Sequence, residues 1–291
     1  MNPKISILTA TFNRSHTLVR LYKSIRRQKN KNFEWIIVDD GSTDRTREIV
    51  KKWISESDNA ITYYPQNNSG KHVAINTGLM HARGSYTFIV DSDDYLCDDA
   101  IEKIIALLSQ IDGKKEFAGI AGLKIHKDGS IIGTTFEGDY VDCTSLERNK
   151  YKIIGDKAEV FKTDILKKHP FPVIEGEKFM PEAYIWNKIA ADGYKIRWFN
   201  EPFMVCEYLE DGLTKNRKTI SKKNINGQLL YIKDLIKYEK NPIRKIAHYS
   251  SYCGLSSIKY ERKITCDSLH INSAQYYLYL FIHKIRGIIN A

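Results

Sequence analysis

Short apolar runs alternate with amphipathic segments over the first hundred residues, and this alternation limits the possible folds more than any other feature. The runs are typical of strands and lie at 5–8, 35–38, 61–64 and 87–90. Apolar residues with helical spacing follow each run, at 18–25, 46–54, 71–82 and 100–108. The pattern predicts an α/β fold with a mostly parallel sheet and helices on both of its faces. In such sheets, ligands bind at the carboxyl ends of the strands.

Polar clusters follow three of these strands, where a ligand is expected. They read Thr-Ala-Thr-Phe-Asn-Arg at 9–14, Asp-Asp-Gly-Ser at 39–42 and Asp-Ser-Asp-Asp at 91–94. Carboxylates one residue apart at a strand end are suited to a hard divalent cation that also takes phosphate oxygens. On these residues alone the alternative stays open, because acids at a strand end are also common turn and helix-cap residues.

The alternation of strand-type and helix-type segments is less regular in the second half of the chain. We expect strands at 118–125, 130–136 and 196–199, a loop at 171–182 and a helix at 183–191. From residue 221 onward the spacing is mostly helical. The five cysteines are scattered and lack metal-ligand spacing, and no basic and apolar leader opens the sequence, so a cytosolic protein with reduced thiols is expected.

Charge is distributed unevenly along the chain. Residues 1–214 carry 30 Lys and Arg against 31 Asp and Glu, whereas residues 215–291 carry 15 against 4. A basic segment of this kind indicates affinity for phosphate, in nucleic acid, at an anionic membrane surface or in a phosphorylated substrate.

Four ordered sequence blocks resemble glycosyltransferase family 2, whose members are inverting enzymes of the GT-A fold with a Rossmann-like sheet. The blocks are Ile-Ser-Ile-Leu-Thr-Ala-Thr-Phe-Asn-Arg at 5–14, Ile-Val-Asp-Asp-Gly-Ser-Thr-Asp at 37–44, Asn-Ser-Gly-Lys-His-Val-Ala-Ile-Asn-Thr-Gly at 68–78 with Ala-Arg-Gly at 82–84, and the acids at 91–94. The resemblance implies a GT-A domain over 1–214, with a nucleotide-binding half at 1–110 and an acceptor-binding half at 111–214. Residues 215–291 then form a basic, mostly helical C-terminal extension.

The resemblance also implies a binding edge for the nucleotide sugar. Thr9 and Thr11 would contact the base and ribose, with Asn13 beside them, although a β-branched residue such as Thr9 is equally typical of a strand interior. Asp40 would accept a hydrogen bond from a uracil-type N–H. Asp39 is better explained as a turn residue beside Gly41.

The diphosphate side of the site is implied in the same way. Lys71 would supply a positive charge to the diphosphate or base, and Asp91 would face the ribose and uridine. Asp93 would hold Mg²⁺ or Mn²⁺, which stabilises charge on the leaving diphosphate, while Asp94 assists or caps. Lys215, in a cation-rich loop, is expected to close over the diphosphate.

The catalytic base is expected in the second half of the chain. Glu182 resembles the family's acidic motif, although Ala183 stands where a second acid is common; Glu177 is the reserve. A carboxylate that takes the proton of the acceptor hydroxyl typically contributes about 10²–10⁴ in rate. An acid at a helix N-terminus, favoured by the helix dipole, is the structural alternative.

Together these features imply a metal-dependent hexosyltransferase-type enzyme that moves a sugar from a nucleotide sugar, a UDP-sugar by preference, to a glycan or lipid-linked acceptor in bacterial surface-polysaccharide synthesis. We expect a cytoplasmic protein, either free or held peripherally on the inner face of an anionic membrane through 215–291, with no nucleic-acid partner. The alternatives are a nucleotidyltransferase or a non-catalytic nucleotide-sugar-binding protein of related fold. A phosphatase with Asp91 as its nucleophile is disfavoured because Tyr95 follows the acids where such sites carry Thr or Val.

Overall fold

The computed structural model describes residues 3–207 and 217–289. These residues form two compact units, one made of 3–171 with 185–207 and the other of 172–184 with 217–289. The segment 172–184 therefore folds with the C-terminal helices, although the sequence pattern grouped it with the preceding domain. The division of the first unit into a nucleotide-binding half and an acceptor-binding half stays a prediction.

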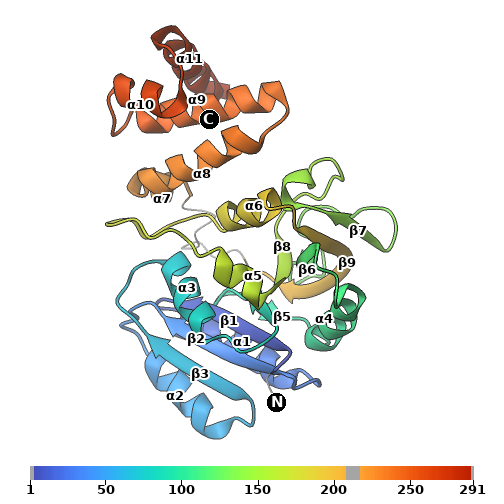
Figure 1. Cartoon of the computed structure of the whole chain (residues 1–291). Coiled ribbons are helices and arrows are strands. Elements are labelled where there is room, and N and C mark those ends of the chain that lie inside the picture. The colour runs from blue at the N-terminus through green and yellow to red at the C-terminus, as the bar shows by residue number, and fades with distance from the viewer. Residues whose placement is uncertain (1–2, 208–216, 290–291) are drawn as a thin grey trace. The chain divides into compact units, whose positions relative to one another are not determined.

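The first unit is built on one mixed sheet with the strand order β3-β2-β1-β4-β8-β6-β9-β5, and β7 pairs with β9 (Figure 1). The strands are β1 (Ile5–Thr11), β2 (Phe33–Asp39), β3 (Ala60–Pro65), β4 (Tyr86–Ile89), β5 (Tyr95–Leu96), β6 (Phe117–Ile125), β7 (Tyr140–Cys143), β8 (Lys157–Lys162) and β9 (Lys195–Val205). The four strands β3, β2, β1 and β4 are mutually parallel, as predicted. Strand β8 is antiparallel to both of its neighbours, while β9 runs parallel to β6.

The helices that accompany this sheet are α1 (Ser15–Arg27), α2 (Thr46–Glu56), α3 (Lys71–His81), α4 (Ala100–Leu108), α5 (Thr163–Lys168) and α6 (Ala183–Ala191), the last of which begins in the segment 172–184. The elements expected over the first 110 residues are confirmed. The strand expected at 130–136 is wrong, since only Ile131 forms an isolated bridge, to Ile125. Gly133, in the middle of this segment, has a φ of 86°, which does not fit the extended backbone of a strand.

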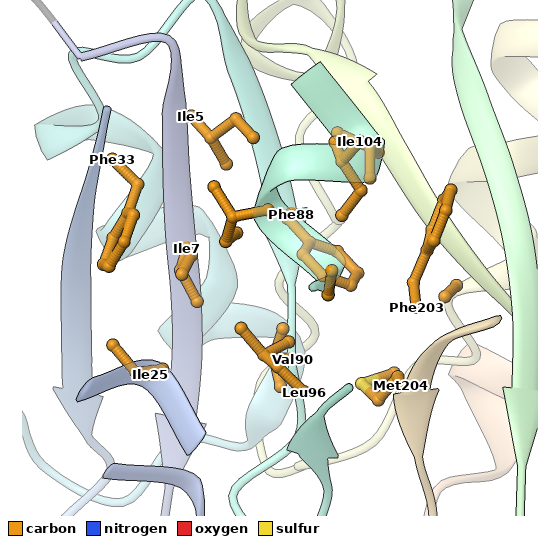
Figure 2. Packing of buried hydrophobic residues seen from close by; sticks show 14 of the residues in the cluster. Ile5, Ile7, Ile25, Phe33, Phe88, Val90, Leu96, Ile104, Phe203 and Met204 are labelled. Atoms are coloured by element: carbon orange, nitrogen blue, oxygen red, sulfur yellow. The ribbon is translucent and has the colours of Figure 1, made fainter. Parts of the chain in front are cut away.

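The hydrophobic core of the first unit contains side chains from several strands of the sheet. Figure 2 shows side chains of β1, β4 and β9 packed together, among them Ile7, Phe88 and Phe203, each 0% exposed. Burial of one such side chain contributes about 1.5–3 kcal/mol. In the register of the sheet, Thr11 of β1 pairs with Asp39 of β2, and Leu8 of β1 pairs with Ile89 of β4. The carboxyl ends of these three parallel strands therefore lie at the same edge.

The block Ala-Arg-Gly at 82–84 fastens the start of β4 to β1 and β2. Glu34 on β2 is buried and accepts hydrogen bonds from the Ser6 hydroxyl at 2.7 Å and from the Arg83 backbone N–H and Nε at 2.8 Å each. Gly84 donates its N–H to Ser6 at 2.8 Å. A Cβ at Gly84 would lie 2.4 Å from the Ser6 nitrogen, so only glycine fits this approach. This block is therefore structural.

The second unit is helical, as expected from the sequence. Its helices are α7 (Arg217–Lys223), α8 (Ile225–Tyr238), α9 (Pro242–Ser256), α10 (Arg262–Leu269) and α11 (Ser273–Ile289). Leu229, Tyr252 and Tyr276 belong to its core. Over 3–207 and 217–289, no helix is both long enough and apolar enough to cross a bilayer.

Candidate functional site

The carboxyl ends of β1, β2 and β4 meet at one edge of the sheet, so the three polar clusters predicted there lie close together. The Asp40 N–H donates to the Thr11 carbonyl at 2.8 Å, which joins the first two clusters. The Asn13 N–H donates to the Ser42 hydroxyl, also at 2.8 Å. The Val90 N–H, just before the acids, donates to the Leu8 carbonyl at 3.0 Å.

Asp40 holds the loop that precedes α3. Its carboxylate is in a residue only 3% exposed and accepts hydrogen bonds from Gln66 Nε2 and from the N–H groups of Ser69 and Gly70, each at 2.8 Å. Asn68 Nδ2 lies 3.3 Å from the same carboxylate. A carboxylate offers about four lone-pair sites, and this loop provides four donors. The structure thus gives Asp40 a positioning role toward the loop, and its contact with a base stays a prediction.

The side chains at the end of β1 differ in how they are engaged. The Thr9 hydroxyl is buried and accepts a hydrogen bond from Trp35 Nε1 at 3.0 Å, so it is held in the core. The Thr11 hydroxyl is buried too, but has no hydrogen-bond partner among the described residues. Asn13 has a positive φ of 53° and accepts from the Thr43 N–H at 2.8 Å, which fixes the turn. Their roles as nucleotide contacts stay predictions.

Lys71 and Asp91 form an ion pair between the start of α3 and the end of β4. Burial acts to raise the pKa of Asp91, but the ammonium groups of Lys71 and Lys124 outweigh it and hold that pKa below its ordinary value. Asp91 is therefore ionised at neutral pH. Lys71 and Asp91, which were predicted to lie on neighbouring loops of one site, are thus in direct contact.

The carboxyl group of Asp93 lies in an environment that disfavours its charged form. Burial, and then the neighbouring charge of Asp91, raise the pKa of its carboxyl group. Its backbone carbonyl accepts from Arg20 Nη2 at 2.6 Å, while Arg20 Nη1 lies 2.5 Å from Glu207 Oε2. Sequence reasoning missed Arg20, because an arginine on an amphipathic helix gives no signal beyond a solvated face.

The carboxylate of Asp94 is engaged by other parts of the protein. It is 6% exposed, accepts a hydrogen bond from Cys206 Sγ at 3.0 Å and lies 3.7 Å from Lys124 Nζ. Burial raises the pKa of Asp94 to about 6 despite the opposing charge of Lys124. These contacts join the acidic cluster to β6 and to the end of β9, and neither partner could be identified from the sequence pattern.

The donor set suits a cation shared with a ligand better than one enclosed by protein. Within the part of the chain that the structure describes, no group of three or more His, Cys, Asp or Glu side chains is arranged to hold a metal ion. Mg²⁺ is commonly bound by one or two carboxylates together with substrate phosphates. Asp93, whose pKa is raised first by burial and then by the charge of Asp91, fits that arrangement, since a bound cation would favour its charged form.

The predicted base and its reserve both belong to the second unit. Glu182 directly precedes α6, and its role as base stays a prediction. Glu177 accepts hydrogen bonds from the N–H groups of Asn226 and Gly227 at 2.7 Å each, so it caps the N-terminus of α8. Because both carboxylate oxygens of Glu177 are engaged in capping α8, Glu182 remains the candidate for the base. Lys215 lies outside the described residues.

Comparison with known proteins finds the same blocks in a protein family. The family model described as "Glycosyl transferase family 2" matches residues 6–116. An uncharacterized glycosyltransferase of Haemophilus influenzae is 30% identical over 61% of this chain and 69% of its own length. A GalNAc(5)-diNAcBac-PP-undecaprenol beta-1,3-glucosyltransferase of Campylobacter jejuni is 27% identical over 87% of this chain and 80% of its own length. The match to the glycosyltransferase GlyA of Streptococcus pneumoniae spans 15% of that protein at 39% identity over 36% of this chain.

Solved structures show the same fold. Staphylococcus aureus TarS 1–349 in complex with UDP-GlcNAc has a TM-score of 0.64 at 19% identity, over 95% of this chain and 79% of that one. The mannosyltransferase PcManGT of Pyrobaculum calidifontis, in complex with GDP-Man and Mn²⁺, has a TM-score of 0.59 at 18% identity, over 99% of this chain and 88% of that one. The expected GT-A architecture is confirmed by these similarities.

Proposed function

This chain belongs to glycosyl transferase family 2, and we propose that it is an inverting, metal-dependent transferase that moves a sugar from a nucleotide-sugar donor to a glycan or lipid-linked acceptor. The observation that carries the proposal is the group of Lys71, Asp91 and Asp93 at the carboxyl edge of β4. A cation and two acids at such an edge suit a nucleoside diphosphate.

We assign the donor as a UDP-sugar, in keeping with the TarS structure solved with UDP-GlcNAc. The ends of β1 and β2 would bind its nucleoside, and Lys71 would bind the diphosphate. Asp93 would hold Mg²⁺ or Mn²⁺, the second of which is present in the PcManGT structure. When bound, the cation would offset the negative charge that collects on the leaving diphosphate.

The transfer proceeds as a single displacement. Glu182 takes the proton from the acceptor hydroxyl, and the oxygen of that hydroxyl forms a bond to the anomeric carbon. The bond from this carbon to the diphosphate oxygen breaks as the new bond forms, and its electron pair leaves with the nucleoside diphosphate. Attack from the opposite side inverts the anomeric centre, so an α-donor yields a β-linkage.

The acceptor is assigned as a glycan on a lipid carrier, because the Campylobacter relative is named for an undecaprenol-linked substrate. We propose that the protein works in the cytoplasm, at the surface of an anionic membrane. The basic balance of residues 215–291, 15 Lys and Arg against 4 Asp and Glu, supports this location.

A donor screen tests the proposed function. UDP release is measured from a panel of UDP-sugars and from GDP-mannose, with Mn²⁺, with Mg²⁺ and with EDTA. We expect one UDP-sugar to be turned over with a divalent cation and turnover to stop with EDTA. Asp93→Ala is expected to lose metal-dependent turnover, and Glu182→Gln is expected to keep UDP binding while losing about 10²–10⁴ in rate.

Three outcomes would contradict parts of this proposal. Turnover that EDTA leaves unchanged would overturn the metal assignment, and full activity in Glu182→Gln would overturn the base. Absence of UDP binding by calorimetry would overturn the donor class itself.

A further inference from the structure

Helix α11 has apolar residues on two opposite sides. On one side Tyr276 is 5% exposed in the core of the second unit, and Tyr279 stacks on Tyr249 with the ring centroids 5.0 Å apart. The other side carries four large apolar residues that are solvent-exposed, at helical spacing: Tyr277 (56%), Leu278 (55%), Phe281 (59%) and Ile285 (39%). A helix at the surface of a globular protein normally has a polar outward side, so this apolar side requires a partner.

The charges around these four residues are positive. Lys284 is exposed on α11, which has no acidic residue between 273 and 289. Arg262 donates from Nη1 to the Tyr277 hydroxyl at 3.1 Å, and its guanidinium carbon lies 5.6 Å from the centroid of that ring. An aromatic residue with a polar tip beside a cation suits the boundary between lipid headgroups and acyl chains.

We propose that the outward side of α11, formed by Tyr277, Leu278, Phe281 and Ile285 together with Lys284, is a membrane-docking surface that enters the headgroup region of an anionic bilayer. Association of this kind grows with buried apolar area and with attraction to anionic lipids. A second copy of the chain is disfavoured as the occupant, because the excess of Lys and Arg in residues 215–291 would be brought against itself. The proposal deepens the proposed function and rests on it, since a lipid-linked acceptor is presented at a bilayer.

Flotation of the full chain with vesicles tests the docking surface. Vesicles of equal parts phosphatidylglycerol and phosphatidylcholine are compared with vesicles of phosphatidylcholine alone, at low and at high salt. We expect binding to the anionic vesicles, weaker binding at high salt, and about a ten-fold loss in Phe281→Glu. Gln275→Glu is the matched control and should bind like the wild type, since it adds the same charge to α11 outside the docking surface, where Gln275 Oε1 accepts from the Asn272 N–H at 3.0 Å.

A second variant tests whether a loss of binding in Phe281→Glu could come from misfolding. Leu278→Ser combined with Ile285→Ser removes apolar area without adding charge, and should also lose binding while its circular dichroism and melting temperature stay near the wild-type values. The proposal is overturned if the wild type does not float, if Phe281→Glu floats equally well, or if light scattering finds a dimer that Phe281→Glu dissociates.

UDP binding and turnover with a water-soluble acceptor separate this proposal from the proposed function. Vesicle binding without UDP binding would reject the enzyme and keep the docking surface. Turnover on a soluble acceptor without vesicle binding would keep the proposed enzyme and reject the docking surface.

Discussion

The ammonium group of Lys71 is paired with the carboxylate of Asp91, which ties the start of α3 to the end of β4. The charge of Lys71 also lowers the pKa of Asp93, although burial and the charge of Asp91 outweigh that effect. A diphosphate arriving at this edge would meet Lys71 already oriented by its partner. Preorganisation of this kind reduces the entropy lost when the ligand binds.

Lys71→Met should weaken UDP binding about ten- to a hundred-fold, because a hydrogen bond to a charged group contributes about 1.5–3 kcal/mol. Calorimetric titration with UDP and Mn²⁺ measures the effect. Lys52→Met removes the same charge from α2, where Lys52 forms an exposed pair with Glu56 at 3.8 Å, and should leave the dissociation constant unchanged. Equal affinity in the two variants would rule out a role for Lys71 in donor binding.

Arg20→Met should weaken donor binding indirectly. The side chain holds the Asp93 carbonyl at 2.6 Å and Glu207 at 2.5 Å, so its loss frees the backbone of the residue assigned to the cation. We expect about a ten-fold higher dissociation constant for UDP with Mn²⁺ and a smaller change without metal. Lys23→Met, exposed on the same helix, is the control. If Arg20→Met lowers stability but leaves metal-dependent affinity unchanged, Arg20 is structural only.

Arg83→Ala should destabilise the first unit by about 1–3 kcal/mol, since it removes two side-chain donors from the buried carboxylate of Glu34. Urea unfolding followed by fluorescence gives the change in free energy. Arg45→Ala breaks a comparable pair with Glu48, but that pair is exposed to solvent, so a much smaller loss of stability is expected. Similar losses in the two variants would show that burial of Glu34 does not strengthen its pairing.

His72 should make the protein less stable in mild acid. Burial lowers the pKa of His72 from its ordinary value of 6.5, although the Asp40 carboxylate opposes this effect. The unfolded chain then binds a proton at a higher pH than the folded chain does. Stability is therefore complete above about 6.5 and is lost as pH falls, by at most about 1.4 kcal/mol per pH unit.

The comparison is between the wild type and His72→Gln, by urea unfolding at several values from about pH 7 to about pH 5. The wild type should lose stability more steeply than the variant as pH falls. Parallel pH profiles would mean that His72 titrates alike in the folded and unfolded chains.

The N-terminal fold could be predicted because each of its strands is short, apolar and followed by a helix with clear periodicity. Strands β7 and β8 were missed for the opposite reason. β7 (Tyr140–Cys143) has one buried residue in four, and Lys157, the first residue of β8, is a lysine buried in the protein, so neither has the pattern that marks a strand. Their positions depend on pairing with distant strands.

The candidate site was predictable at the level of strand ends but not of individual contacts. The family resemblance located Asp91 and Asp93, and the sheet topology explains why they lie near Lys71. The inward orientation of Asp94 toward Cys206 arises from residues more than a hundred positions apart. No local pattern in the sequence can report such a contact.

The segment 172–184 belongs to the C-terminal helical unit, and Glu177 in that segment caps α8. The helical unit is consequently assembled from two separate stretches of the gene product. Exchange of this unit between related enzymes, by recombination or in the laboratory, must therefore carry two pieces of sequence, and the piece nearer the N-terminus includes Glu182. A chimaera joined at a single point after β9 would combine one parent's α8 with the other parent's cap.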